Sequence, residues 1–363
     1  MIAACETKWG PTRMPPRSDP PPVVPPTGPA WFCAGTKLMT LRGEIPAERV
    51  VEGDRALTLS GIDAPLKPVL GVRRLEVDLD GHPQPTLATP IRVCADAMAP
   101  GVPVRDLLLA PGHAVRLEDA EGQTVLVPVA YLANGATILR APEAGTVAYV
   151  QILLGAHDVL MADGMGAEAA MPDPMPPPVL VRLHAPPAAA CADLSPRRPS
   201  ASCLPMLFGA EAALLHAALL ARAEALGHVT TDDPAFTLWA GGRDIPAAPT
   251  AAGEMRFVLP ANTDRVRLVS RSRIPMELAP AAGDPRRLGV ALARVRHAGA
   301  PIGLDSPAFG PGFLAPEPEG WRWTDGAGEL RLPPMAQEST LEIGLTGAWS
   351  RYWSSDPPAS TFT

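Results

Sequence analysis

From Thr36 onward, short runs of β-type residues alternate with Gly, Pro and Asp turns, and this alternation restricts the possible folds more than any other feature. The runs are roughly 3 to 11 residues long, and no apolar period of helical length lies between them. In the first half of the chain they cover residues 36–40, 55–59, 69–79, 91–93 and 124–129. Many short strands without intervening helices predict an all-β fold, either closed or sandwiched.

One later segment has the pattern of a helix. Residues 210–226 carry an apolar stripe, and Gly227 is expected to end the helix. The stripe consists of Leu214, Leu215, Ala218, Leu219, Ala221, Arg222 and Leu226. Strand-like segments then resume at residues 236–239, 255–259, 265–270, 287–296 and 340–345. Their turn signals recur about every ten residues, which predicts a C-terminal β-sandwich.

The 46 prolines are concentrated in two stretches, which divide the chain. We expect a disordered Pro-rich tail at residues 1–29 and a Pro-rich linker at residues 172–205. A first β domain would then occupy residues 30–171. The helix would occupy residues 206–228, and an accessory β-sandwich residues 229–355. A chain of 363 residues is long enough for two such domains.

Composition excludes several classes of partner. The net charge of -7 argues against nucleic acid, because no basic face is built up. The five cysteines lie at irregular spacings without a CxxC pair, so we expect neither a metal nor another cofactor. No apolar run approaches the ~20 residues that span a bilayer, and no secretory signal is readable. A cytoplasmic location is the default expectation, with export by a non-classical route left open.

Three ordered blocks carry a resemblance to a known family. The first is residues 35–58, GTKLMTLRGEIPAERVVEGDRALT. The second is residues 106–115, DLLLAPGHAV, which contains His113, and the third is residues 149–164, YVQILLGAHDVLMADG, which contains His157. Residues 132–138, LANGATI, lie between the last two. Together they resemble the bacterial form of the Hint domain, the all-β self-processing module of hedgehog proteins and inteins.

The resemblance implies a specific chemistry. In the family, a cysteine or serine at the start of the domain attacks the preceding carbonyl, and the peptide bond becomes a thioester or ester. A histidine protonates the departing amide nitrogen. His113 corresponds to that general acid and His157 to a supporting residue. The substrate would be the chain's own N-terminal segment.

The sequence departs from the family pattern at the nucleophile. Trp31 occupies the expected position, and indole cannot attack a carbonyl. Cys33 follows two residues later, on the same face of a strand but about 6.6 Å along it. A local bulge would let Cys33 act; otherwise it is a small core residue. No asparagine follows Gly164 directly, where residues 165–168 run on as MGAE without a following nucleophile, so protein splicing is not expected. Ala110 stands where the family usually has a hydroxyl residue.

The C-terminal half offers one candidate binding surface, formed by Trp321 and Trp323. Aromatic faces beside charged residues suit sugar rings, although the same rings could fill the core of a sandwich. Two hypotheses therefore stand. One is self-cleavage by an N–S acyl shift at Cys33, assisted by His113 and His157. The other is a catalytically silent Hint scaffold whose C-terminal sandwich binds a glycan or a cell-surface partner. Enzymatic activity stays open between them.

Overall fold

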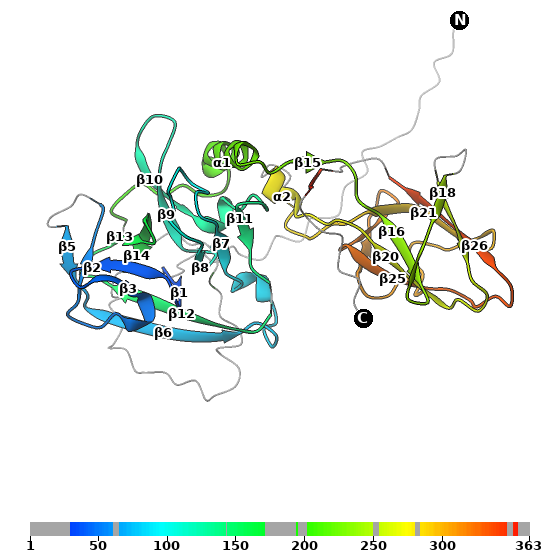
Figure 1. The fold of residues 1–363 in the computed structure, drawn as a ribbon, viewed down its shortest axis with the longest axis horizontal. Coiled ribbons are helices and arrows are strands. Elements are labelled where there is room, and N and C mark those ends of the chain that lie inside the picture. The colour runs from blue at the N-terminus through cyan, green and yellow to red at the C-terminus, as the bar shows by residue number, and fades with distance from the viewer. Residues whose placement is uncertain are drawn as a thin grey trace, which may run out of the picture.

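The computed structural model describes residues 30–60, 65–142, 144–170, 194, 202–249, 254–279, 284–346 and 351–354. The predicted tail at residues 1–29 and most of the predicted linker at residues 172–205 lie outside this part of the chain. The described residues are dominated by strands (Figure 1), so the prediction of an all-β chain is confirmed. Within them, no helix combines the length and apolar character that crossing a membrane requires.

The N-terminal unit, residues 30–170, consists of two antiparallel sheets. The first has six strands in the order β11 (Ile138–Arg140), β7 (Ile91–Val93), β8 (Leu107–Leu109), β1 (Phe32–Cys33), β12 (Thr146–Leu153) and β6 (Gly71–Asp78). The second runs β10 (Thr124–Pro128), β9 (Ala114–Glu118), β14 (Met165–Ala169), β13 (Asp158–Ala162), β2 (Lys37–Thr40), β4 (Arg55–Leu57) and β5 (Leu66–Pro68), with β3 (Gly43–Pro46) beside β2.

Both sheets contribute to one apolar core. Strands β1, β8 and β12 supply Phe32, Leu109 and Val150, and the second sheet supplies residues such as Leu38 and Val115. Side chains alternate between the two faces of a strand, so each strand gives only every second residue to this core. The short β1 lies between β8 and β12, because Phe32 pairs with both Leu109 and Val150.

The closing hairpin β13–β14 explains how the third sequence block folds. Ala162 pairs with Met165, and the two residues between them, Asp163 and Gly164, have φ values of 45° and 80°. Two positive φ angles make a type I′ turn, for which Asp-Gly is a favoured sequence. The turn fixes a register in which Val159 faces Glu168 across the two strands.

Helix α1 (Ala213–Ala225) follows a short 3₁₀ turn (Gly209–Ala212) and ends as predicted at Gly227, whose φ is 96°. His228 N–H donates to Ala223 and Gly227 N–H to Glu224, the pattern of a Schellman motif. The predicted apolar stripe is wrong in its orientation. The buried face is His216, Leu219 and Ala223, whereas Leu214 is 74% exposed. A polar contact explains this orientation of the helix, because His216 points inward and its Nε2 lies 2.9 Å from the carbonyl oxygen of Ala133.

The C-terminal unit, residues 229–354, contains two larger sheets. One has the order β17 (Arg243–Ile245), β16 (Thr237–Ala240), β20 (Arg265–Val269) and β25 (Ala327–Arg331). The other has the order β18 (Ala247–Pro249), β19 (Met255–Leu259), β26 (Ser339–Leu345), β21 (Ala291–His297), β24 (Arg322–Thr324) and β23 (Phe313–Pro316), with β22 (Ala300–Pro301) beside β21. Both sheets contribute to one core, for example Leu268 from the first and Ile343 from the second.

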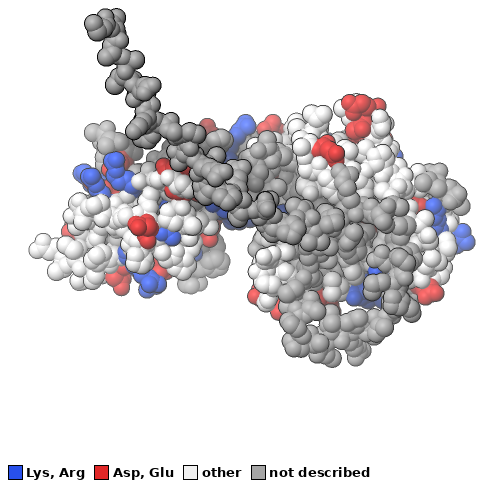
Figure 2. Space-filling model, turned by 180° about the vertical axis from the view of Figure 1, so that it is seen from behind, with Lys and Arg blue, Asp and Glu red and all other residues white. Residues whose placement is uncertain are grey.

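The two units meet at the one-turn helix α2 (Pro275–Leu278) and at the strand pair β15 (Thr230–Thr231) and β27 (Tyr352–Trp353). In Figure 1, α2 and β15 lie between the two groups of sheets. Trp353 is buried, and its Nε1–H donates to the carbonyl oxygen of Asn134 at 2.8 Å. On the face drawn in Figure 2, acidic and basic side chains of the described residues are interspersed.

Candidate functional site

The second sequence block places His113 directly against β1. The ring of His113 is completely buried, with its centroid 4.4 Å from that of the Phe32 ring and the two planes inclined at 67°. Neither ring nitrogen has a hydrogen-bond partner of normal geometry. Burial lowers the pKa of His113, while the charge of Glu168 and nearby backbone groups of Trp31 and Glu168 act in the opposite direction. The imidazole is therefore held in its neutral form at neutral pH.

Cys33 lies on the other side of the same strand. Phe32 points into the main core, whereas its neighbours Trp31 and Cys33 belong to a separate apolar cluster with Tyr149. This is the alternation expected of an extended strand. Because the ring of His113 packs on Phe32, the imidazole and the Cys33 thiol are on opposite sides of β1.

The surroundings of Cys33 also disfavour ionisation. Its side chain is 3% exposed, and burial raises the pKa of the thiol far above its usual value. The thiolate is the nucleophilic form of cysteine, so Cys33 is a poor nucleophile in this environment. The structure brings His113 to the backbone of Trp31 and the ring of Phe32, but it does not bring His113 to Cys33.

His157, the third residue expected from sequence, belongs to a different polar group. It precedes β13, and its Nε2 lies 2.8 Å from Oε1 of Glu168 on β14. His157 is two residues before Val159, the cross-strand partner of Glu168, so both side chains lie on the same face of the hairpin. The other carboxylate oxygen of Glu168 accepts the backbone N–H of Ala114 at 3.1 Å.

The opposite edge of the His157 ring meets a cysteine that the sequence did not single out. The backbone N–H of Cys203 donates to Nδ1 of His157 at 3.3 Å, and Sγ of Cys203 lies 3.3 Å from the same nitrogen. Cys203 is held there by backbone hydrogen bonds between residues 205–207 and the edge strand β10: Leu126 N–H donates to Pro205, and Leu207 N–H donates to Leu126. We call Cys203, His157 and Glu168 the thiol triad.

Opposing effects set the charge of the thiol triad. Burial alone would lower the pKa of His157, but hydrogen bonds to Cys203 and Glu168, together with the charges of both groups, outweigh burial and raise the pKa to about 9. The carboxylate and the sulfur therefore favour the protonated ring, whereas acceptance of the Cys203 backbone N–H requires a lone pair on Nδ1. The described residues contain no cluster of His, Cys, Asp and Glu that could hold a metal ion.

Sequence reasoning could not find Cys203 or Glu168. Cys203 is 46 residues from His157 and falls in the stretch 172–205 that the prolines mark as a linker. Glu168 lies on β14, beyond the end of the third block at Gly164. Its proximity to His157 becomes visible only in the register of the β13–β14 hairpin, which places Glu168 opposite Val159.

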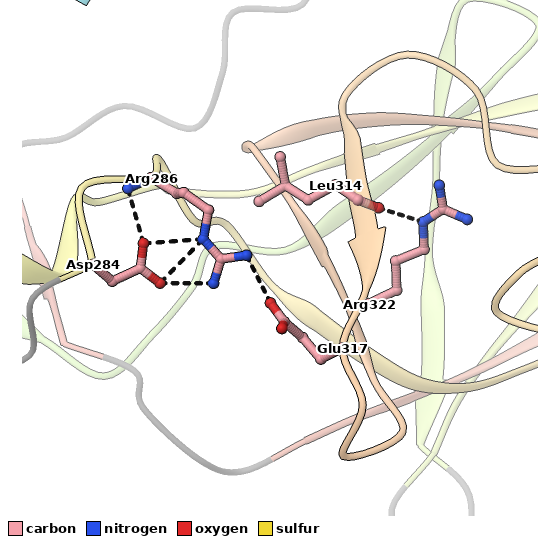
Figure 3. Close-up of polar contacts among 5 residues, drawn as sticks. All are labelled: Asp284, Arg286, Leu314, Glu317 and Arg322. Atoms are coloured by element: carbon pink, nitrogen blue, oxygen red, sulfur yellow. Dashed lines mark hydrogen bonds and ion pairs between the residues drawn. The ribbon is translucent and has the colours of Figure 1, made fainter. Parts of the chain in front are cut away.

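The two C-terminal tryptophans differ in environment. Trp323 lies on β24, is 7% exposed and packs with Leu288 and Ala291. Trp321 is half-buried against this cluster. The intervening Arg322 lies 4.8 Å from the centroid of the Phe309 ring and donates from Nε to the carbonyl oxygen of Leu314 at 2.6 Å (Figure 3). Trp323 is therefore a core residue, and only Trp321 keeps part of its indole exposed.

Arg286 forms ion pairs with Asp284 at 2.7 Å and Glu317 at 2.8 Å, as Figure 3 shows. These contacts join the loop before β21 to the turn between β23 and β24. An arginine already paired with two carboxylates does not offer an anion site.

Comparison with known proteins identifies the N-terminal unit. Residues 30–174 match the family model described as Hint domain. This part of the chain is a Hint domain, and the prediction of the family is confirmed.

Similar solved structures are inteins and an intein-like domain. The chain is 11% identical to the gp41-1 intein, with a TM-score of 0.25, covering 39% of this chain and 98% of that one. It is 14% identical to a bacterial intein-like domain from Clostridium thermocellum, with a TM-score of 0.26 and coverage of 39% and 99%. For the MchDnaB-1 intein the values are 13%, 0.26, 38% and 99%. No curated protein matches the chain.

Proposed function

We propose that the Hint domain of this chain serves as a β scaffold that does not cleave its own backbone at Cys33. One observation carries the proposal: the Cys33 thiol and the His113 imidazole are on opposite sides of β1. General acid catalysis needs the donor within about 3.2 Å of the atom it protonates, or one water away. A thiol attack without that acid leaves an amide nitrogen that departs poorly.

Self-cleavage at the Phe32–Cys33 bond would require β1 to turn over. Phe32 would then leave the main core, where it is completely buried and paired with Val150 and Leu109. Removing a buried phenylalanine from a core costs about 3–5 kcal/mol. Ionising the buried thiol adds a further cost, because burial raises its pKa. Both costs oppose the acyl shift.

The intact mass of the full-length chain tests this proposal. Purified protein incubated with hydroxylamine, which cleaves thioesters, should keep its full mass, and Cys33→Ala should behave identically. The reason is that no thioester forms at a thiol that lacks an acid partner. Release of a fragment ending at Phe32 from the native protein, and its absence in Cys33→Ala, would contradict the scaffold proposal and restore self-processing of the N-terminal segment.

Carbohydrate binding by the C-terminal unit is a second proposal, and the partial exposure of Trp321 is the observation that favours it. A partly exposed indole can stack on the apolar face of a sugar ring, whereas the 7% exposed Trp323 offers no such face. This narrows the expected glycan or cell-surface contact to Trp321.

A pair of variants separates binding from packing in this unit. Trp321→Ala should abolish any glycan-array signal and lower the free energy of unfolding by only about 1 kcal/mol, because its indole is half-buried at the edge of the cluster. Trp323→Ala should lower that free energy by about 3 kcal/mol, because a buried indole is lost. Absence of binding by the unmodified protein at millimolar sugar would remove the carbohydrate proposal.

A further inference from the structure

We propose that Cys203, His157 and Glu168 form a thiol centre that accepts an acyl group from an activated ester or thioester and passes it to water. This activity goes beyond the scaffold role, and it uses neither Cys33 nor His113. The three side chains come from three separate places in the chain: the segment hydrogen-bonded to the edge of β10, the residue before β13, and β14 itself.

The contacts run in series, and this order points to a relay. Cys203 Sγ lies 3.3 Å from Nδ1 of His157, and Nε2 on the far side of the same ring lies 2.8 Å from Glu168 Oε1. A nucleophile, a base and a group that orients the base follow this order in triads on unrelated folds. Metal ligands would instead converge on one point, and no such group occurs among the described residues.

Glu168 is held by hydrogen bonds to both of its carboxylate oxygens. Its side chain is 7% exposed, and its two oxygens are divided between His157 and the backbone N–H of Ala114 at 3.1 Å. A buried carboxylate is costly unless it is paired and hydrogen-bonded. Here it pairs with the ring edge that faces away from the sulfur, which sets the orientation of the other edge towards Cys203.

The sulfur of this centre is more accessible than that of Cys33. Cys203 is half-buried, and the residues near it in the chain, Ser202 and Pro205, are exposed. Cys94 has the same intermediate burial but faces Asp106 and Arg92 instead of a histidine. The chain therefore contains its own control for a half-buried thiol without an imidazole.

The reaction balances without any added oxidant or cofactor. As the Cys203 sulfur bonds to the acyl carbon, Nδ1 of His157 takes the thiol proton; the bond from that carbon to the leaving oxygen or sulfur breaks, and Nδ1 passes the proton to the leaving group. Water then attacks the Cys203 thioester while Nδ1 takes one of its protons and passes it to the departing sulfur. The carboxylic acid departs, and the Cys203 thiol and the ring are restored.

Peptide-resolved alkylation of the full-length native protein tests the activation of the thiol. With iodoacetamide at pH 6.5, Cys203 should react at least about tenfold faster than Cys94, because an imidazole beside the sulfur can take the thiol proton as the sulfur attacks, whereas burial and the charge of Asp106 raise the pKa of the Cys94 thiol. His157→Gln should slow Cys203 at least about fivefold and leave the rate of Cys94 unchanged. Equal rates for Cys203 and Cys94 in the native protein, or an unchanged Cys203 rate in His157→Gln, would overturn the proposal.

A second probe tests acyl transfer itself. Incubation with p-nitrophenyl acetate should place one acetyl group on Cys203, detected by peptide mapping, and continued release of p-nitrophenol should require Cys203. Cys203→Ser should stop this release, and Glu168→Gln, which keeps the shape of the side chain, should slow it at least about tenfold. Thermal melting of each variant confirms folding. Acetyl groups found only on lysine or the N-terminus, or release that persists in Cys203→Ser, would contradict the acyl-transfer centre.

Discussion

Gly312→Ala is expected to lower the free energy of unfolding by about 4 kcal/mol, combining backbone strain with a steric clash. Gly312 has a φ of 80°, a region that side chains other than glycine rarely adopt. A Cβ there would lie 2.7 Å from the carbonyl carbon of Ala327 and closer still to its oxygen. The backbone cannot yield easily, because Asp325 N–H donates to Gly312 and Glu329 N–H donates to Pro311.

Gly320→Ala is the matched control for this variant. Gly320 also has a positive φ, of 95°, but a Cβ built on it meets no atom within 4 Å. It should cost only the backbone strain, about 1–2 kcal/mol. Urea unfolding followed by tryptophan fluorescence measures both variants. Equal losses for Gly312→Ala and Gly320→Ala would show that the close approach to Ala327 is not part of the folded structure.

Asn134→Ala is expected to lower the free energy of unfolding by about 4 kcal/mol, because this one side chain makes the hydrogen bonds that hold residues 136–138. Its Oδ1 accepts the backbone N–H groups of Ala136, Thr137 and Ile138, each at 3.0 Å. Its Nδ2 donates to the hydroxyl of Thr137 at 3.1 Å and to the carbonyl oxygen of Leu219 at 3.4 Å, which ties the loop to α1. The side chain is completely buried, so water cannot replace these bonds.

Thr137→Val is the control for Asn134→Ala, because it removes only one of the hydrogen bonds of Asn134. It removes one contact of Asn134 Nδ2 and leaves the three bonds to Oδ1, so it should cost about 1 kcal/mol. Chemical denaturation with far-ultraviolet circular dichroism measures the two variants. If Asn134→Ala were no more damaging than Thr137→Val, the loop would not depend on the asparagine amide in the way described.

The sequence predicted strands in both units because alternation and turn residues are local signals. Residues 91–93 and 255–259 were expected and found as β7 and β19 without change. The Asp163–Gly164 turn was not predicted, although its cause is equally local, since few residue pairs accept two positive φ angles. Helix α1 was placed correctly, but its buried face was not, because the polar contact of His216 with Ala133 outweighs an apolar stripe that is exposed at Leu214.

The site was harder to predict than the fold. Trp31 and Cys33 are two residues apart, so alternation places both side chains on one face of the strand. Only the folded structure, in which Phe32 pairs with Leu109 and its ring contacts His113, shows that the histidine lies on the other face. Cys203 reaches His157 through backbone hydrogen bonds at the edge of β10, and backbone bonds leave no side-chain signature. The burial of Trp323 likewise depends on packing against Leu288 and Ala291.

We assign the thiol chemistry of this chain to Cys203 and not to Cys33. The decisive experiment is a short alkylation pulse on the native, full-length protein, followed by peptide mapping. We expect rapid modification of Cys203 and none of Cys33 until the protein is unfolded in denaturant, because Cys33 is buried and separated from His113. Rapid native labelling of Cys33 that slows in His113→Gln, with Cys203 unmodified, would contradict it.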